Sequence, residues 1–238
     1  KISAKDTIKS MANVPWIICT VTMLLVIAQV VVKASTTLYY TVNVLENAGI
    51  SSTLLSIANV IGIPITLIIP FIASKIGNRN LVWVGAILGI LGNLGLFFFK
   101  AASAPVIIAF AAICSIGTAF INGIIYVMCA QAVDFGEWKQ GVRVQGFLMA
   151  FIGFAVKIAN SLVQMIVTAI LDAAGYVGSA ATQTASAIRG IEFCYVWIPI
   201  IVFVIVLVAN AFFKLDKLYP QIKADLEARH AAAESAAE

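Results

Sequence analysis

The sequence predicts an all-α membrane protein with six transmembrane helices arranged as two three-helix repeats. Hydrophobic residues make up 62% of the 238 residues and charged residues only 11%, and the mean hydropathy is +1.03. A typical soluble domain is about half apolar and about a quarter charged, and a soluble fold of this length could not bury so much apolar surface. Disordered chains are poor in hydrophobic residues, so the composition excludes disorder as well. Most of the chain therefore lies in lipid.

Six apolar runs are long enough to cross a membrane. A hydrocarbon core of about 30 Å needs about 20 apolar residues in a helix, and continuous runs favour helices over a barrel. The expected spans are residues 14–45, 52–73, 81–100, 104–132, 144–171 and 190–213. The breaks between them have ordinary loop chemistry, including a charged segment at 134–143 and a stretch of small residues at 173–187.

Basic residues collect on one side of the expected membrane. Two of them, Lys100 and Arg189, lie on the other side, and Lys33 and Lys157 fall within spans. The remaining eleven are Lys1, Lys5, Lys9, Lys75, Arg79, Lys139, Arg143, Lys214, Lys217, Lys223 and Arg229. Because loops rich in Lys and Arg stay in the cytoplasm, both termini are expected there. These cations then face an anionic leaflet, so the net charge of +4 does not call for nucleic acid.

Three regions follow from the spans and their orientation. They are a cytoplasmic lead-in at 1–13, a six-helix transmembrane domain at 14–214 and a cytoplasmic tail at 215–238. The lead-in has neither the apolar core nor the cleavage site of a signal peptide. Because the sequence starts at Lys1 without a Met, we expect it to be part of a longer chain.

The sequence contains no recognisable catalytic or metal-ligating set. The four cysteines are scattered singly in apolar runs and are expected to be small buried hydrophobes. The only histidine, His230, lies in the polar tail. Nucleophile elbow, P-loop and dinucleotide motifs are also missing from the sequence. An enzyme is therefore not expected, and no metal site is assigned.

Polar side chains within four of the spans favour a transport path. Most of them recur three, four or seven residues apart, which places them on one face of each helix. They are Thr22, Gln29, Lys33, Thr36, Tyr40 and Asn43 in the first span, Ser56, Asn59 and Thr66 in the second, Thr118, Asn122 and Tyr126 in the fourth, and Lys157, Asn160, Ser161, Gln164 and Thr168 in the fifth. The third span has glycines spaced for close helix contact and the sixth is aliphatic, so both are expected to face lipid. Two cavity helices followed by a peripheral helix, repeated once, are typical of transporters.

Lys157 is the most informative polar residue. Polar stripes often serve only for interhelical hydrogen bonds of about 0.5–2 kcal/mol. A lysine near the middle of a span costs about 2.5–3.5 kcal/mol, so it calls for a cavity, a partner or a function. The acids of the spans lie only at their ends, and the partner of Lys157 is therefore expected from outside these six helices. Lys33 is closer to the outer interface, where snorkelling is an equal alternative.

The segment Asp134-Phe-Gly-Glu137-Trp138-Lys139-Gln-Gly-Val-Arg143 packs two acids and two bases into ten residues. Such a segment suits a cytoplasmic piece whose ion pairs form and break as helices move; a solvated loop anchored by Trp138 is the alternative. The segment resembles the signature of the glycoside–pentoside–hexuronide:cation symporters, the melibiose-permease-like branch of the major facilitator superfamily. The pairs Tyr39-Tyr40, Val156-Lys157 and Gly175-Tyr176 agree with that family, and the resemblance runs from about Asp6 to Arg229.

The resemblance implies the C-terminal six-helix half of a major-facilitator fold in a bacterial cytoplasmic membrane. It implies secondary active transport of a sugar, glycoside or hexuronide coupled to Na⁺ or H⁺ by alternating access. The partners would be the sugar, the bilayer and the N-terminal six-helix half, which would bind most of the coupling cation; no other cofactor is implied. The substrate-binding candidates are Lys157, Asn160, Gln164, Asn122, Tyr126 and Lys33, and the cytoplasmic gate candidates are Asp134, Glu137, Lys139 and Arg143. Lys33 stands where the family's permease has an apolar residue, and it could favour an acidic sugar such as a hexuronide.

Two other functions remain open at this point. A major-facilitator transporter of a lipid, drug or organic anion is one, although the amide-rich stripe of the fifth span argues mildly against it. The other is a non-transporting six-helix membrane subunit in which the polar stripes are packed shut. Reaction of Asn160→Cys or Gln164→Cys with a water-soluble thiol reagent would count against this closed arrangement.

Overall fold

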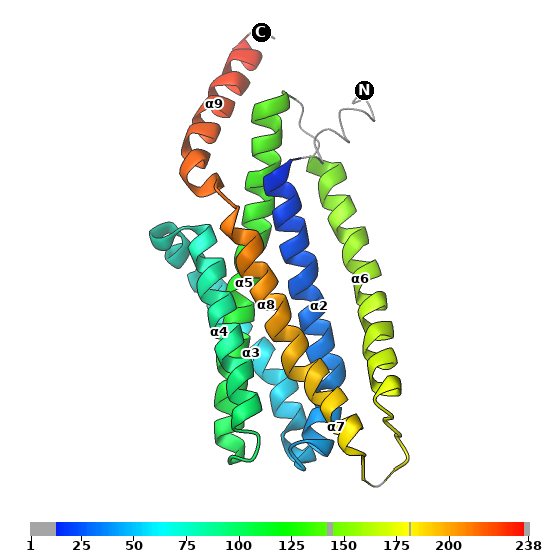
Figure 1. Ribbon diagram of the computed structural model, residues 1–238. Coiled ribbons are helices and arrows are strands. Elements are labelled where there is room, and N and C mark those ends of the chain that lie inside the picture. Colours follow the sequence, from blue (N-terminus) through cyan, green and yellow to red (C-terminus); the bar gives the residue numbers. More distant parts are fainter. Residues whose placement is uncertain (1–12, 142–144, 181, 236–238) are drawn as a thin grey trace.

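The computed structural model describes residues 13–141, 145–180 and 182–235, and all the regular structure in these residues is helical (Figure 1). Six helical spans are long and apolar enough to cross a membrane, which confirms the six predicted from the sequence. Five are α2 (Val14–Asn43), α3 (Ser51–Ile76, preceded by the short η1, Ala48–Ile50), α4 (Asn78–Phe98), α5 (Ala104–Gln140) and α6 (Gln145–Ala173). The sixth joins α7 (Ala185–Glu192), the π-helical segment η2 (Phe193–Trp197) and α8 (Ile198–Ala211), and the tail forms α9 (Leu215–Ser235).

The spans form two layers. In the first layer α3 packs against α5, α5 against α2 and α2 against α6, and in the second layer α4 and α8 pack against each other and behind α5 and α2. Figure 1 shows α6 and α4 on opposite sides of the bundle. The first layer consists of the four helices that carry the predicted polar stripes. The predicted grouping, in which two helices with polar stripes are followed by one peripheral helix in each repeat, is therefore the grouping that the structure has.

Burial within the chain differs between the helices of the two layers. Half of the most apolar window of α4 and of α7–α8 is buried inside the chain, against 11% for α3 and for α6. The third and sixth spans therefore keep an exposed outer face, as expected of peripheral helices, and pack their inner faces against the rest of the chain. The helices with the most exposed surface are α3 and α6, at the two ends of the first layer.

Glycines explain the close packing of α4. A Cβ on Gly92 would lie 2.5 Å from the backbone nitrogen of Cys114, and a Cβ on Gly85 would lie 2.7 Å from the carbonyl oxygen of Gly117. Both distances are far below ordinary contact, so α4 and α5 approach each other backbone to backbone along this seam. The spacing of these glycines predicted close helix contact, and the structure confirms it.

The fourth span is longer than predicted. We expected a break at Asp134, but α5 continues through Asp134 to Gln140 and ends at Gly141, whose φ of 72° suits glycine. The charges marked the limit of the apolar run, not the end of the helix. The tail helix α9 packs against this extension through Ile222 and Leu226, both of which are buried.

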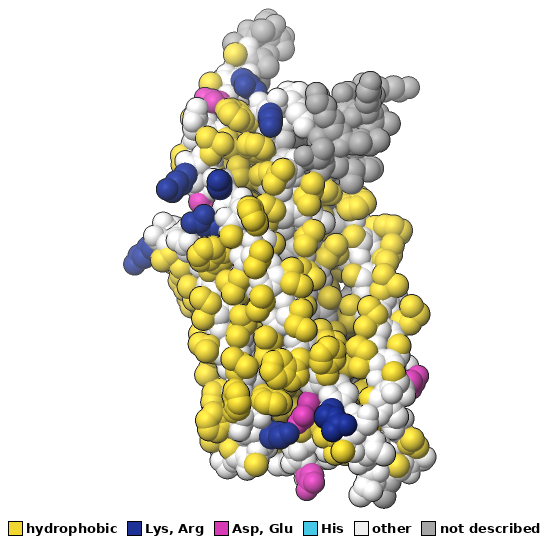
Figure 2. Space-filling model, in the orientation of Figure 1, with side chains coloured by type: hydrophobic (Ala, Val, Ile, Leu, Met, Phe, Trp, Pro, Cys, Tyr) yellow, Lys and Arg dark blue, Asp and Glu magenta, His cyan; other side chains and the backbone are white. Residues whose placement is uncertain are grey.

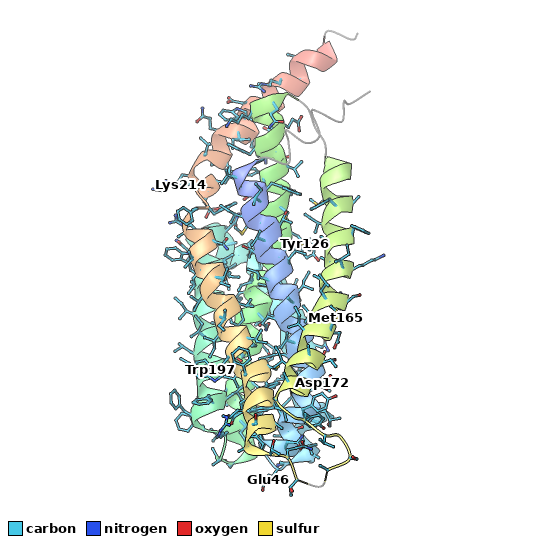
Figure 3. All side chains as sticks on the ribbon, turned by 45° about the vertical axis from the view of Figure 1, so that its right-hand side comes forward. Glu46, Tyr126, Met165, Asp172, Trp197 and Lys214 are labelled. Atoms are coloured by element: carbon cyan, nitrogen blue, oxygen red, sulfur yellow. The ribbon has the colours of Figure 1, made fainter. Side chains whose placement is uncertain are left out.

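The two ends of the bundle differ in charge. Hydrogen bonds from Asn78 to Gln131 and from the Arg79 backbone to Asp216 place the α3–α4 turn, the α5 extension and α9 at one end, which we call the basic end. The described basic residues there are Lys75, Arg79, Lys139, Lys214, Lys217, Lys223 and Arg229, whereas Lys100 and Arg189 lie at the opposite end. Figure 2 shows an apolar surface between two groups of charges, and Figure 3 shows Glu46 and Asp172 at the end opposite Lys214.

Candidate functional site

A cavity of about 540 Å³ lies in the first layer, between α2, α3 and α5. Its volume is within the range of about 300–1,000 Å³ that is usual for small-molecule sites. The walls combine apolar residues with polar ones, and the polar residues important here are Gln29, Lys33, Thr118, Asn122, Tyr126 and Tyr195. Among the described residues that line the cavity, Lys33 is the only charged one. The cavity can therefore offer hydrogen bonds and one positive charge.

The polar wall follows from helical periodicity. On α2, Gln29 and Lys33 are one turn apart, and on α5, Thr118, Asn122 and Tyr126 are spaced by the same four residues. The two rows meet where Gln29 Nε2 donates to Thr118 Oγ1 over 3.4 Å. Gln29 is only 2% exposed, and its Oε1 is buried without a hydrogen-bond partner among the described residues. A buried acceptor in this state is costly unless a donor reaches it.

Lys33 rests on a pair of anchored aromatic rings. Its Nζ lies 4.3 Å from the centroid of the Tyr195 ring, in the range of a cation–π contact. Tyr195 stacks on Tyr40 with 4.2 Å between centroids, and the Tyr40 hydroxyl donates to the Leu96 carbonyl oxygen over 2.8 Å. Tyr195 belongs to η2, and π-helical turns frequently occur at functional sites.

The structure brings three of the six predicted substrate residues together. Lys33, Asn122 and Tyr126 line the cavity; Asn122 is half-buried and Tyr126 is 59% exposed. Figure 3 shows Tyr126 in the middle third of the bundle's length. The other three, Lys157, Asn160 and Gln164, lie on α6 and do not line this cavity.

The α6 residues form a second polar surface on the other side of α2. Gln164 Nε2 donates to Ser35 Oγ over 2.6 Å, and this hydrogen bond joins α6 to α2. Asn160 Oδ1 is buried without a partner among the described residues. Lys157 is exposed, and in the described part of the chain no acid forms an ion pair with it.

Two features of the site were missed by the sequence analysis. Tyr195 lies in a span without a polar stripe, and only the aromatic run Phe193–Trp197 could have pointed to it. The stripe on α2 also divides, because Thr22 and Tyr40 turn toward the second layer while Gln29 and Lys33 face the cavity. Thr22 Oγ1 accepts from Asn210 Nδ2 of α8 over 2.8 Å.

The tail helix α9 holds one of the predicted gate residues, Asp134, and also Trp138 of the same segment. Tyr219 donates to Asp134 Oδ2 over 2.9 Å, and Trp138 Nε1 donates to Asp225 Oδ2 over 2.8 Å. A third bond joins Arg229 to the Trp138 carbonyl oxygen over 3.0 Å.

The other gate candidates differ in their surroundings. Glu137 is buried, 8% exposed, while Lys139 is exposed with its Nζ 5.8 Å from the Phe135 ring centroid. Arg143 lies outside the described residues. The contact of α9 with this segment was not anticipated from the sequence, which predicted only a cytoplasmic tail at 215–238.

The six spans in two layers, with a polar cavity in one of them, define a polytopic membrane protein. The chain belongs to the MFS/sugar transport protein family, whose sequence profile matches residues 2–217. This confirms the resemblance drawn from the charged signature, and proteins of this family are transporters and not enzymes.

Relatives of known or assigned cargo cover nearly the whole chain. The isoprimeverose transporter of Lactiplantibacillus pentosus is 34% identical over 232 residues, which are 97% of this chain and 48% of that protein. The glucuronide carrier protein homolog of Escherichia coli (strain K12) is 28% identical over 90% of this chain and 47% of its own length. A putative sulfoquinovose importer of the same strain is 25% identical over 86% of this chain and 44% of its own length. The chain thus spans about half the length of the curated relatives it matches.

Proposed function

We propose that this chain is the C-terminal half of a carrier that moves a sugar, glycoside or hexuronide by alternating access, coupled to Na⁺ or H⁺. Three named relatives carry or are assigned sugars, one neutral and two acidic, and each is about twice as long as the aligned region. In such carriers, repeated three-helix units form a substrate path near the bilayer midplane. The polar first layer supports this function.

The state of Lys157 is the observation that carries the proposal. Its ammonium group is exposed on α6, with twelve residues of the helix before it and sixteen after it, so it lies far from both ends. A cation at such a depth needs a counter-ion or water. We propose that an acid of the N-terminal half supplies it and that the same region binds most of the coupling cation. Asn160 and Gln164 would then face the substrate path on one side of α2, and the cavity would form its other side.

The exposure of α3 and α6 supports the same arrangement. Only 11% of the most apolar window of each helix is buried within this chain. These helices flank the first layer, so a second six-helix half placed against that layer would cover both of them. We propose that the basic end is cytoplasmic, as the positive-inside rule expects. The α5 extension and α9 would then form part of the cytoplasmic gate.

Uptake by the complete carrier tests the proposal. Lys157→Ala is expected to abolish cation-coupled sugar uptake while leaving expression and monodispersity unchanged. Lys75→Ala removes an exposed lysine from the last turn of α3 and is the matched control, expected to keep wild-type uptake. Wild-type uptake by Lys157→Ala would remove this lysine from the mechanism, and failure of the unaltered carrier to take up any glycoside would refute the proposed function.

A further inference from the structure

Among the described residues that line the cavity between α2, α3 and α5, one side chain is charged and one carries a buried hydrogen-bond acceptor without a partner. The charge is Lys33, and the acceptor is the buried Oε1 of Gln29, one turn away on the same helix. No described residue that lines the cavity is acidic, and Glu192, three residues before Tyr195, is itself paired with Lys100. A cationic ligand would be repelled by Lys33, whereas an acidic ligand would pair with it.

We propose that Lys33 is the anion-binding residue of this cavity and that the chain selects an acidic sugar, one with a carboxylate or sulfonate group. The inference rests on the proposed function and names the substrate class of that carrier. The cation–π contact with Tyr195 holds the ammonium group in place while the cavity is empty. An ion pair with a partly desolvated acid is stronger than the cation–π contact. An acidic ligand can therefore displace the Tyr195 ring and pair with the ammonium group.

The aromatic pair keeps Lys33 from leaving the cavity. Tyr195 is buried between the ammonium group and Tyr40, and Tyr40 is fixed by its hydrogen bond to Leu96. The lysine therefore rests on a rigid surface inside the protein and does not need to snorkel to the membrane interface. This contact favours the cavity over snorkelling, which were the two alternatives that the sequence left open for Lys33.

The positions of these groups along the bundle axis predict how the ligand is oriented in the cavity. The Gln29–Thr118 hydrogen bond marks one level where α2 and α5 meet. Lys33 is four residues, about 6 Å, from this level toward the end opposite the basic end, and Tyr126 is eight residues, about 12 Å, toward the basic end. The acidic group of the sugar would bind at Lys33. The sugar ring would lie beside the Gln29–Thr118 level, and the exposed Tyr126 ring would meet the aglycone or a second sugar.

The test compares ligands that differ only in the acidic group. Methyl β-glucuronide, methyl β-glucoside and methyl sulfoquinovoside are offered to the complete carrier in proteoliposomes, and uptake and binding are measured. Binding of at least one acidic glycoside is expected to be about 10- to 100-fold tighter than binding of the glucoside, as for a hydrogen-bonded charge pair. The variant Lys33→Gln should lose this preference, Lys33→Arg should keep it, and Lys75→Gln should leave it unchanged.

The outcomes separate the inference from the proposed function. Equal affinity of the unaltered carrier for acidic and neutral glycosides would overturn the inference without need of any variant, and so would a preference that survives in Lys33→Gln. In both cases the uptake itself would still support the carrier. Absence of uptake and binding for all three glycosides would refute the carrier and the inference together. Should Lys33→Gln not fold, Lys33→Met removes the same charge.

Discussion

A single methyl group on Gly117 should force α4 and α5 apart. A Cβ at this position would lie 2.3 Å from the Gly85 carbonyl oxygen and 2.6 Å from the Gly89 nitrogen, whereas ordinary contact begins near 3.4 Å. Both neighbours are backbone atoms of α4, so a side-chain rotation cannot relieve the clash. Relief requires the helices to separate by about 1 Å, and overpacking of this kind costs about 1–3 kcal/mol. For a protein of this size the melting temperature should fall by about 2–12 °C.

Thermal unfolding of the purified protein in detergent measures this effect. Gly153→Ala is the matched control, because it makes the same substitution within α6 and a Cβ there meets no atom within 4 Å. Its melting temperature should stay equal or rise slightly, since alanine favours helix over glycine. Equal melting temperatures for Gly117→Ala and Gly153→Ala would refute the backbone contact between α4 and α5, and with it the packing of the second layer on the first.

Two further predictions concern the ends of the bundle. Asp225→Ala removes the acceptor of the Trp138 indole bond, so amide hydrogen exchange in α9 should speed up about fivefold. Glu227→Ala should leave exchange unchanged, because the Glu227 carboxylate pairs with the exposed Lys223 one turn away on the same helix. At the opposite end a double-mutant cycle of Lys100→Met and Glu192→Gln should give a coupling of about 0.5–1.5 kcal/mol, since Glu192 is largely buried but the Lys100 side chain is 43% exposed. Exchange that is equally fast in both tail variants, or a coupling of zero, would contradict these contacts.

The spans and their grouping could be predicted because the bilayer imposes a simple rule on the sequence. The length of the apolar runs predicted the six helices, and the spacing of the polar residues predicted which four helices form the first layer. The glycines of α4 gave its close packing for the same reason, since only glycine permits backbone contact. These signals are local to one helix, and a single sequence contains them in full.

What could not be predicted depends on contacts between helices. Thr22 and Lys33 belong to one stripe in the sequence, yet Thr22 bonds to α8 and Lys33 faces the cavity. The two residues differ because α2 packs against different helices along its length. Tyr195 enters the site through the π-helical turn of an otherwise aliphatic span. Asp134 lies on a continuing helix and bonds to Tyr219 of α9, a contact that hydropathy alone does not reveal.

The most direct test of the account asks whether water and substrate reach the first layer. In a background in which the four buried native cysteines are replaced by alanine, Asn122→Cys places a thiol in the cavity and Asn93→Cys places one in the buried contact between α4 and α5. The account predicts that a membrane-impermeant maleimide labels Asn122→Cys in the complete carrier, that an acidic glycoside slows this labelling, and that Asn93→Cys stays unlabelled. Labelling of Asn122→Cys that is as slow as that of Asn93→Cys, or that no glycoside changes, would contradict a substrate path through this cavity.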